Sequence, residues 1–237
     1  MSGYPGAYLR WQARDVLRGP GIVAAIIAGF FAFVVWRLPA GAAGAAGAAT
    51  LLGAYLQQVG WPMVLVATGE MVRSDRTEGY YRFYFARPIQ PSLFYVVRFL
   101  LGFALVLAVV GVAAFAVWAR TGSSGLDGRL LAQVGLTYLL LGGLVFLLST
   151  VTTSGPRDWL IALIIQVFQA MSSELLATGV INWRLIRWLH TILPPTHRLD
   201  AAFDSADVLH AGLYGLGLVA VAVLILHRRP LGGGARD

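Results

Sequence analysis

Three polar side chains at helical spacing interrupt an apolar part of the chain. Gln166, Gln169 and Ser173 are three and four residues apart, so they share one face of a helix, with Glu174 next to them. Polar side chains are costly in hydrocarbon and usually face the interior of a helix bundle or a water-filled cavity. The row therefore predicts either hydrogen bonds to neighbouring helices or the wall of a polar cavity.

A second polar row lies in the apolar segment 49–69. Tyr55, Gln58 and Pro62 follow a similar helical register, and Trp61 lies beside them. Helix contacts and cavity walls in membranes select the same residue types, so both interpretations stay open here as well.

Composition places both rows in membrane helices. Of 237 residues, 58% are hydrophobic and 12% are charged, whereas about a quarter of the residues in a soluble domain are charged. About 20 apolar residues cross the hydrocarbon core. We therefore expect an all-α integral membrane protein with a single transmembrane domain, 1–237, whose six spans are 22–38, 49–69, 92–118, 130–151, 159–181 and 208–226. Ala211, Gly212 and Gly215 give the last span a small-residue face suited to close helix packing.

Two further segments are expected to lie at the membrane surface. Segment 7–19 predicts an interfacial helix, because Arg10, Arg14 and Arg18 share one face and apolar residues share the other. Segment 182–207 mixes tryptophan, arginine, histidine and proline, which predicts a structured outer segment before the last span.

Arginine placement predicts the orientation of the chain. All 18 basic residues other than histidine are arginine. With the N-terminus inside, twelve arginines lie on the inner side and six on the outer side, which favours a multi-pass protein of the cell membrane with both termini in the cytosol. We therefore expect the positively charged residues, which give a net charge of +7, to interact with anionic lipid headgroups. No nucleic-acid partner is expected.

The inner loop 70–90 is charged in its first half and aromatic in its second. Residues before Pro88 and Pro91 are pushed out of helical geometry, so a helix in this loop must be short. Ser92 is expected to cap the helix that follows. The loop predicts either an aromatic belt at headgroup depth or a docking surface for a cytosolic partner.

The pattern Arg76-Thr-Glu78-Gly79, followed about nine residues later by Pro88-Ile89 and a long apolar helix, resembles the first cytoplasmic loop of ABC-2 type permeases. These proteins are the membrane subunits of ABC exporters. The resemblance extends to the interfacial helix, the six spans and the structured outer segment. The aromatic cluster 80–85 departs from the smaller aliphatic residues expected in that family.

The resemblance implies a role for each set of residues. The loop becomes a coupling helix seated on an ATPase subunit, and the second and fifth spans line the solute pathway. The residues implied for ATPase docking are Arg76, Glu78, Gly79, Tyr80, Tyr81, Phe83 and Pro88. Those implied for the substrate path are Tyr55, Gln58, Trp61, Gln166, Gln169, Ser173 and Glu174.

The resemblance also implies partners. Two permease copies, most simply a homodimer, would associate with two ABC ATPase subunits and export an amphipathic or hydrophobic solute. A P-loop needs a lysine, and this sequence has none. ATP hydrolysis, with its Mg²⁺, is therefore expected on a separate chain, and no catalytic residue, cofactor or metal site is expected in this one.

Two other functions stay open. An integral membrane enzyme acting on lipid or peptide would need paired acids, a Ser/His pair or metal ligands at matched depth, and the spans offer only Glu174. A membrane anchor subunit of another complex would need no such residues.

Overall fold

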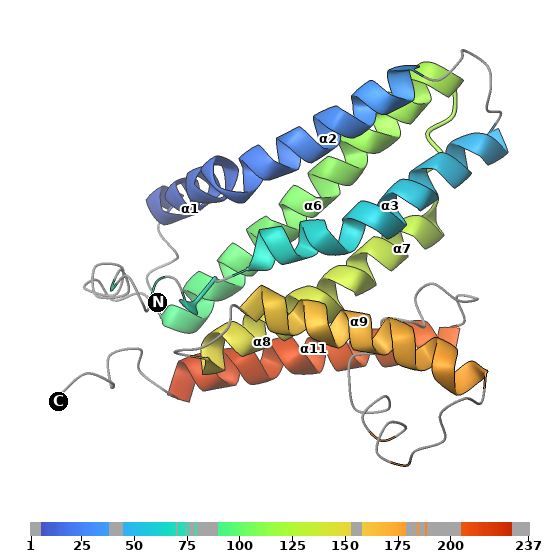
Figure 1. The fold of residues 1–237 in the computed structure, drawn as a ribbon. Coiled ribbons are helices and arrows are strands. Elements are labelled where there is room, and N and C mark those ends of the chain that lie inside the picture. The colour runs from blue at the N-terminus through green and yellow to red at the C-terminus, as the bar shows by residue number, and fades with distance from the viewer. Residues whose placement is uncertain are drawn as a thin grey trace. The chain divides into compact units, whose positions relative to one another are not determined.

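The computed structural model describes residues 6–37, 45–69, 71–73, 75, 79, 90–152, 158–178, 184, 188 and 205–228. Every regular element in these residues is a helix, so the all-α prediction is confirmed for the described part of the chain (Figure 1). The helices are α1 (Gly6–Arg18), α2 (Pro20–Arg37), α3 (Ala45–Thr68), α6 (Pro91–Thr121), α7 (Gly128–Thr137), the π-helix η1 (Tyr138–Gly142), α8 (Gly143–Val151), α9 (Asp158–Ala177) and α11 (Ser205–Arg228).

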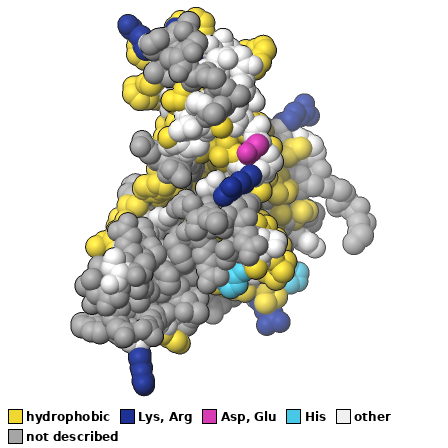
Figure 2. Space-filling view, turned by 90° about the vertical axis from the view of Figure 1, so that its right-hand side faces the viewer, with side chains coloured by type: hydrophobic (Ala, Val, Ile, Leu, Met, Phe, Trp, Pro, Cys, Tyr) yellow, Lys and Arg dark blue, Asp and Glu magenta, His cyan; other side chains and the backbone are white. Residues whose placement is uncertain are grey.

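Among the described residues, four stretches of helix are long and apolar enough to cross a membrane, and they indicate a membrane-embedded protein. They are Pro20–Arg37, Pro91–Thr121, Gly128–Val151 and Val208–Arg228. Large hydrophobic side chains lie on their outer surfaces (Figure 2). Phe30 on α2 and Phe115 on α6, for example, are 69% and 64% exposed. In a membrane such side chains contact lipid, where exposure of apolar surface carries no cost.

Helices α3 and α9 occupy the two remaining predicted spans. Their described apolar stretches are shorter, Gly47–Leu56 and Val59–Thr68 in α3 and Leu160–Gln169 in α9. Both stretches of α3 belong to one continuous helix of 24 residues, Ala45–Thr68. Both segments are helical, as predicted. Only the four longer stretches among the described residues meet the length and hydropathy requirement for crossing a membrane, so the predicted layout of six crossings stays a prediction.

The chain forms two compact units. The first contains Met1–Ala67 and Val97–Gly135, and the second contains Thr68–Val96 and Leu136–Asp237. Each unit has its own packed interior, so each is described by itself below.

The core of the first unit is built by three helices. It combines Phe31 and Val35 of α2, Ala48 and Leu52 of α3, and Ala113, Ala114 and Val117 of α6. Small alanines on α3 and α6 allow the helices to approach closely, while α2 contributes the larger side chains. The turn after α6 closes on this core at Gly125, whose φ is +63° and whose added Cβ would lie 2.6 Å from the backbone of Ala48. Only glycine fits this backbone geometry and this contact.

In the second unit, α11 packs against η1 and α8. A Cβ on Gly215 would lie 2.9 Å from the backbone of Leu139, and a Cβ on Gly143 would lie 3.2 Å from the carbonyl oxygen of Gly215. Ala211 is buried in the same interface with Leu140. The predicted small-residue face of the last span is therefore confirmed as a close helix contact. The sequence pattern did not predict that the facing element is a π-helix.

Candidate functional site

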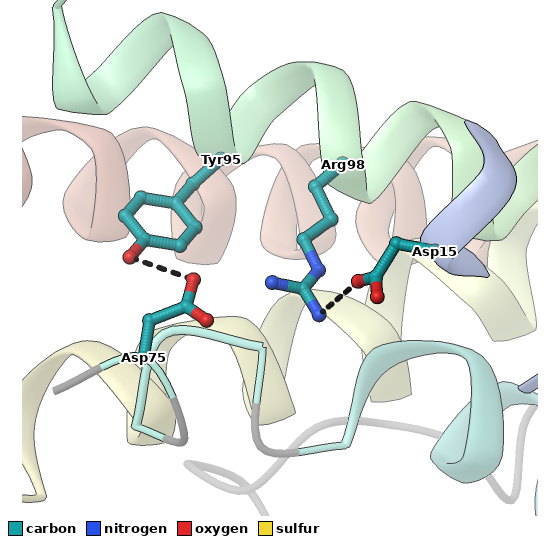
Figure 3. A network of polar contacts seen from close by, with 4 residues as sticks. All are labelled: Asp15, Asp75, Tyr95 and Arg98. Atoms are coloured by element: carbon teal, nitrogen blue, oxygen red, sulfur yellow. Dashed lines mark hydrogen bonds and ion pairs between the residues drawn. The ribbon is translucent and has the colours of Figure 1, made fainter. Parts of the chain in front are cut away.

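The base of the inner loop is held by a buried hydrogen bond in the second unit. The Tyr95 hydroxyl of α6 donates to Oδ2 of Asp75 at 3.1 Å (Figure 3). Tyr95 is fully buried and Asp75 is 3% exposed. A carboxylate out of water needs such donors, because its desolvation is costly without them. The bond thus fixes the loop, just after α3, to the first turns of α6.

A second buried contact fixes the same stretch of loop to α8. The backbone N–H of Val72 donates to Oγ of Ser149 at 3.1 Å. Val72, Ser149 and the neighbouring Met71 are all buried. Ser149 lies in the last turns of α8, so within this unit the loop base is attached to the first turns of α6 and to α8.

The start of α6 follows from its first residues. Proline is favoured at the first helical position because it has no N–H to leave unsatisfied, and α6 begins at Pro91. The Phe94 N–H donates to the carbonyl oxygen of Gln90 at 3.1 Å, which makes Gln90 the residue at the helix boundary. The prediction that Ser92 caps this helix is therefore wrong, since Ser92 already lies inside the first turn.

The predicted docking residues lie outside the described residues, apart from one glycine. The residues outside the described part of the chain are Arg76, Glu78, Tyr80, Tyr81, Phe83 and Pro88. Gly79 has a φ of +74°, the left-handed region in which glycine is favoured because it lacks a Cβ. The glycine of the Arg-Thr-Glu-Gly pattern thus has a backbone conformation that other residues rarely adopt.

In the first unit, an ion pair joins α1 to α6. Nη2 of Arg98 lies 3.2 Å from Oδ2 of Asp15 (Figure 3). Their side chains are 19% and 47% exposed, so water screens the pair and its net contribution to stability is about 0 to 1 kcal/mol. The pair is one contact between α1 and the part of α6 that belongs to this unit.

Tyr55, predicted for the substrate path, packs into the core of the first unit. Its ring stacks on Phe31 with centroids 3.8 Å apart and contacts the cluster that includes Leu52. Its hydroxyl oxygen is buried and has no hydrogen-bond partner in the described structure. Trp61 is half-buried, and Gln58 lies in α3 with a side chain outside the described residues. The aromatic ring of Tyr55 therefore has a structural role in the core of the first unit.

In the second unit, Gln166 and Gln169 lie on one face of α9 as predicted. Gln169 is fully buried, and Gln166 is half-buried. Oε1 of Gln166 has no hydrogen-bond partner within the described part of the chain. The side chains of Ser173 and Glu174, further along the predicted row, lie outside the described residues.

Sequence reasoning did not select Asp75, Tyr95 or Ser149 as functional candidates. Asp75 was one of several charged residues in a polar loop, and Tyr95 and Ser149 fell in predicted spans without a polar row. One signal was present: the apolar residues Met71 and Val72 stand between Glu70 and Arg73 at the start of a charged loop, and apolar residues of this kind are often buried.

In the described residues, no group of three or more His, Asp or Glu side chains lies close enough to hold a metal ion. No protein-family model, curated protein sequence or solved structure matches the chain.

Proposed function

We propose that this chain is the permease subunit of an ATP-driven exporter of the ABC-2 type, with inner loop 70–90 as the lever on which separate ATPase subunits act. The observation that carries the proposal is the attachment of the loop base. A lever transmits force only if its base is fixed, and Val72 and Asp75 are fixed by hydrogen bonds to Ser149 of α8 and Tyr95 of α6.

Burial makes these two attachments stiff. All four residues are at most 3% exposed, so water does not compete for the hydrogen bonds, and breaking one leaves a buried polar group unsatisfied. Displacement of the loop therefore moves the start of α6 and the end of α8 with it. The alternative interpretation of the loop, an aromatic belt at headgroup depth, needs no buried hydrogen bonds of this kind.

The proposal includes a membrane layout. α3 and α9 serve as the second and fifth crossings in addition to the four long apolar stretches, and both termini lie in the cytosol. Two copies form a homodimer around a path that Gln166 and Gln169 of each copy line, and an amphipathic or hydrophobic solute moves outward. ATP and Mg²⁺ bind to the partner ATPase.

The test is purification of the intact assembly in mild detergent from cells that express the chain together with its neighbouring genes. We expect an ATPase with a P-loop to co-purify at about equal amounts, because each permease loop seats one ATPase. Glu78→Arg reverses a charge on the docking surface, and Tyr80→Ala with Phe83→Ala removes two aromatic anchors. Each variant should detach that ATPase or abolish its stimulation by solute.

The matched control removes two aromatic rings elsewhere. Phe30→Ala with Phe115→Ala deletes two exposed rings of α2 and α6 and should leave both association and hydrolysis unchanged. Equal ATPase retention by the loop variants and by this control would exclude the loop as the docking element. A companion without a P-loop would instead favour an anchor subunit, and turnover of lipid or peptide by the isolated chain would favour an enzyme.

A further inference from the structure

Helix α1 turns its arginines away from the protein. Gln12 and Val16, four residues apart, are 1% and 6% exposed and form the face that packs inward. Arg10, Arg14 and Arg18 are also four residues apart and are exposed. At 100° per residue, Arg14 lies about 160° around the helix from Gln12, so the arginine stripe stands nearly opposite the buried face.

None of these three arginines forms an ion pair with a described residue. The nearby acid, Asp15, pairs with Arg98 instead. Three uncompensated positive charges on one helix face attract anions, and the attraction adds up along the stripe.

Apolar side chains flank the same stripe. Leu17 is 63% exposed on one side, and Trp11 is 39% exposed on the other. Leu9, which is 45% exposed, lies on the side of Leu17, about 100° around the helix from Arg10. Arginine beside exposed leucine and tryptophan matches the boundary between phosphate headgroups and acyl chains. A site for free phosphate or for a nucleic acid gains nothing from exposed leucines, so the flanking residues favour lipid.

The helix is also joined directly to a stretch of chain that is able to cross a membrane. α2, one of the stretches able to cross the membrane, begins at Pro20, two residues after α1 ends. Gly19 makes the junction, with its N–H donating to the Asp15 carbonyl oxygen at 3.0 Å and its own carbonyl accepting from the Ile22 N–H at 3.2 Å. Burial of Gln12 and Val16 sets the rotation of α1 about its axis, which keeps the arginines outward.

We propose that α1 is a binding surface for anionic phospholipids, whose headgroup phosphates pair with Arg10, Arg14 and Arg18 while their acyl chains contact Leu9 and Leu17. This inference does not rest on the exporter function. It would hold equally for an enzyme or an anchor subunit.

The experiment measures binding of phosphatidylglycerol and of phosphatidylcholine to the full chain in detergent, by thermophoresis of fluorescently labelled protein. We expect tighter binding of phosphatidylglycerol. Each Arg→Gln variant at positions 10, 14 and 18 should weaken it about fivefold, and the triple variant roughly a hundredfold, because one arginine near an anionic surface contributes about that factor. Phosphatidylcholine binding should not change.

The control variant Arg37→Gln, Arg184→Gln and Arg228→Gln removes the same charge at three other exposed arginines and should keep the preference. Raising salt from about 0.1 M to 1 M shortens the Debye length from roughly 10 Å to 3 Å, so it should abolish the preference in the unmodified chain, a readout that needs no variant. Equal binding of the two lipids, an equal loss in the control, or displacement of the lipid by inorganic phosphate at the same concentration would each overturn the proposal.

Discussion

Tyr95 of α6 donates a hydrogen bond to Asp75 of the inner loop, and both side chains are buried although 20 residues of chain separate them. The bond connects the inner loop to α6, the helix that follows the loop in the sequence. Because a buried carboxylate loses its hydration, each donor it keeps matters more than the same bond would at the surface.

Replacing Tyr95 by phenylalanine tests this bond. The substitution keeps the ring and removes the donor, so Tyr95→Phe should destabilise the protein by about 1 to 3 kcal/mol. Tyr55→Phe is the matched control, because the buried Tyr55 hydroxyl has no hydrogen-bond partner in the described structure. It should leave the protein as stable as before or more so. The measurement is the midpoint of thermal unfolding of the purified protein in one detergent, and equal midpoints for the two variants would contradict the assigned bond.

The contact between Val72 and Ser149 gives a second prediction. Ser149→Ala leaves the buried N–H of Val72 without its acceptor, which should cost about 1 to 3 kcal/mol. Ser92→Ala is a matched control, since Ser92 is 8% exposed and its hydroxyl forms no hydrogen bond with the described residues. Hydrogen exchange at the amide of Val72 should accelerate in the first variant only. Unchanged exchange there would mean that another group holds the loop base.

The helices themselves were predictable from the sequence. Spans such as 92–118 and 208–226 are encoded by length and hydropathy alone, because crossing a membrane requires about 20 apolar residues in a helix. The structure places α6 at Pro91–Thr121 and α11 at Ser205–Arg228, within a few residues of those predictions. The small residues around Gly215 likewise predicted a close contact, since their spacing repeats along one helix face.

The contacts that hold the loop were not predictable in the same way. The bond from Tyr95 to Asp75 depends on where the loop returns in space, and a single sequence carries no periodic signal for such a pair. Gln12 shows the same limit, because its polar side chain lies between arginines in the sequence and is nevertheless 1% exposed. Helix periodicity predicts which residues share a face, whereas tertiary packing decides which face is covered.

The close approach of α11 to η1 gives a third prediction. A methyl group on Gly215 would lie 2.9 Å from the backbone of Leu139, so Gly215→Ala forces the two helices apart and should cost about 1 to 3 kcal/mol. Gly217→Ala, on the same helix, meets no atom within 4 Å and should stabilise by up to about 1 kcal/mol through its helix propensity. Thermal unfolding midpoints should therefore move in opposite directions for two identical substitutions. A shift of the same sign in both would contradict the tight contact at Gly215.

A variant of Gln166 can distinguish the two interpretations of the polar row on α9, which are hydrogen bonds to neighbouring helices and the wall of a polar cavity. A glutamine that hydrogen-bonds a neighbouring helix contributes about 0.6 kcal/mol, but Oε1 of Gln166 has no partner in the described part of the chain. Gln166→Leu should therefore leave the unfolding midpoint unchanged or raise it, because it removes a half-buried amide that forms no such bond. If the row lines the solute path, the same variant should lower the stimulation of the partner ATPase by solute. Gln169, which is fully buried three residues further along the same row, gives a second variant, Gln169→Leu, for the same two measurements. A lower midpoint for Gln166→Leu with unaltered ATPase stimulation would assign the row to helix packing alone.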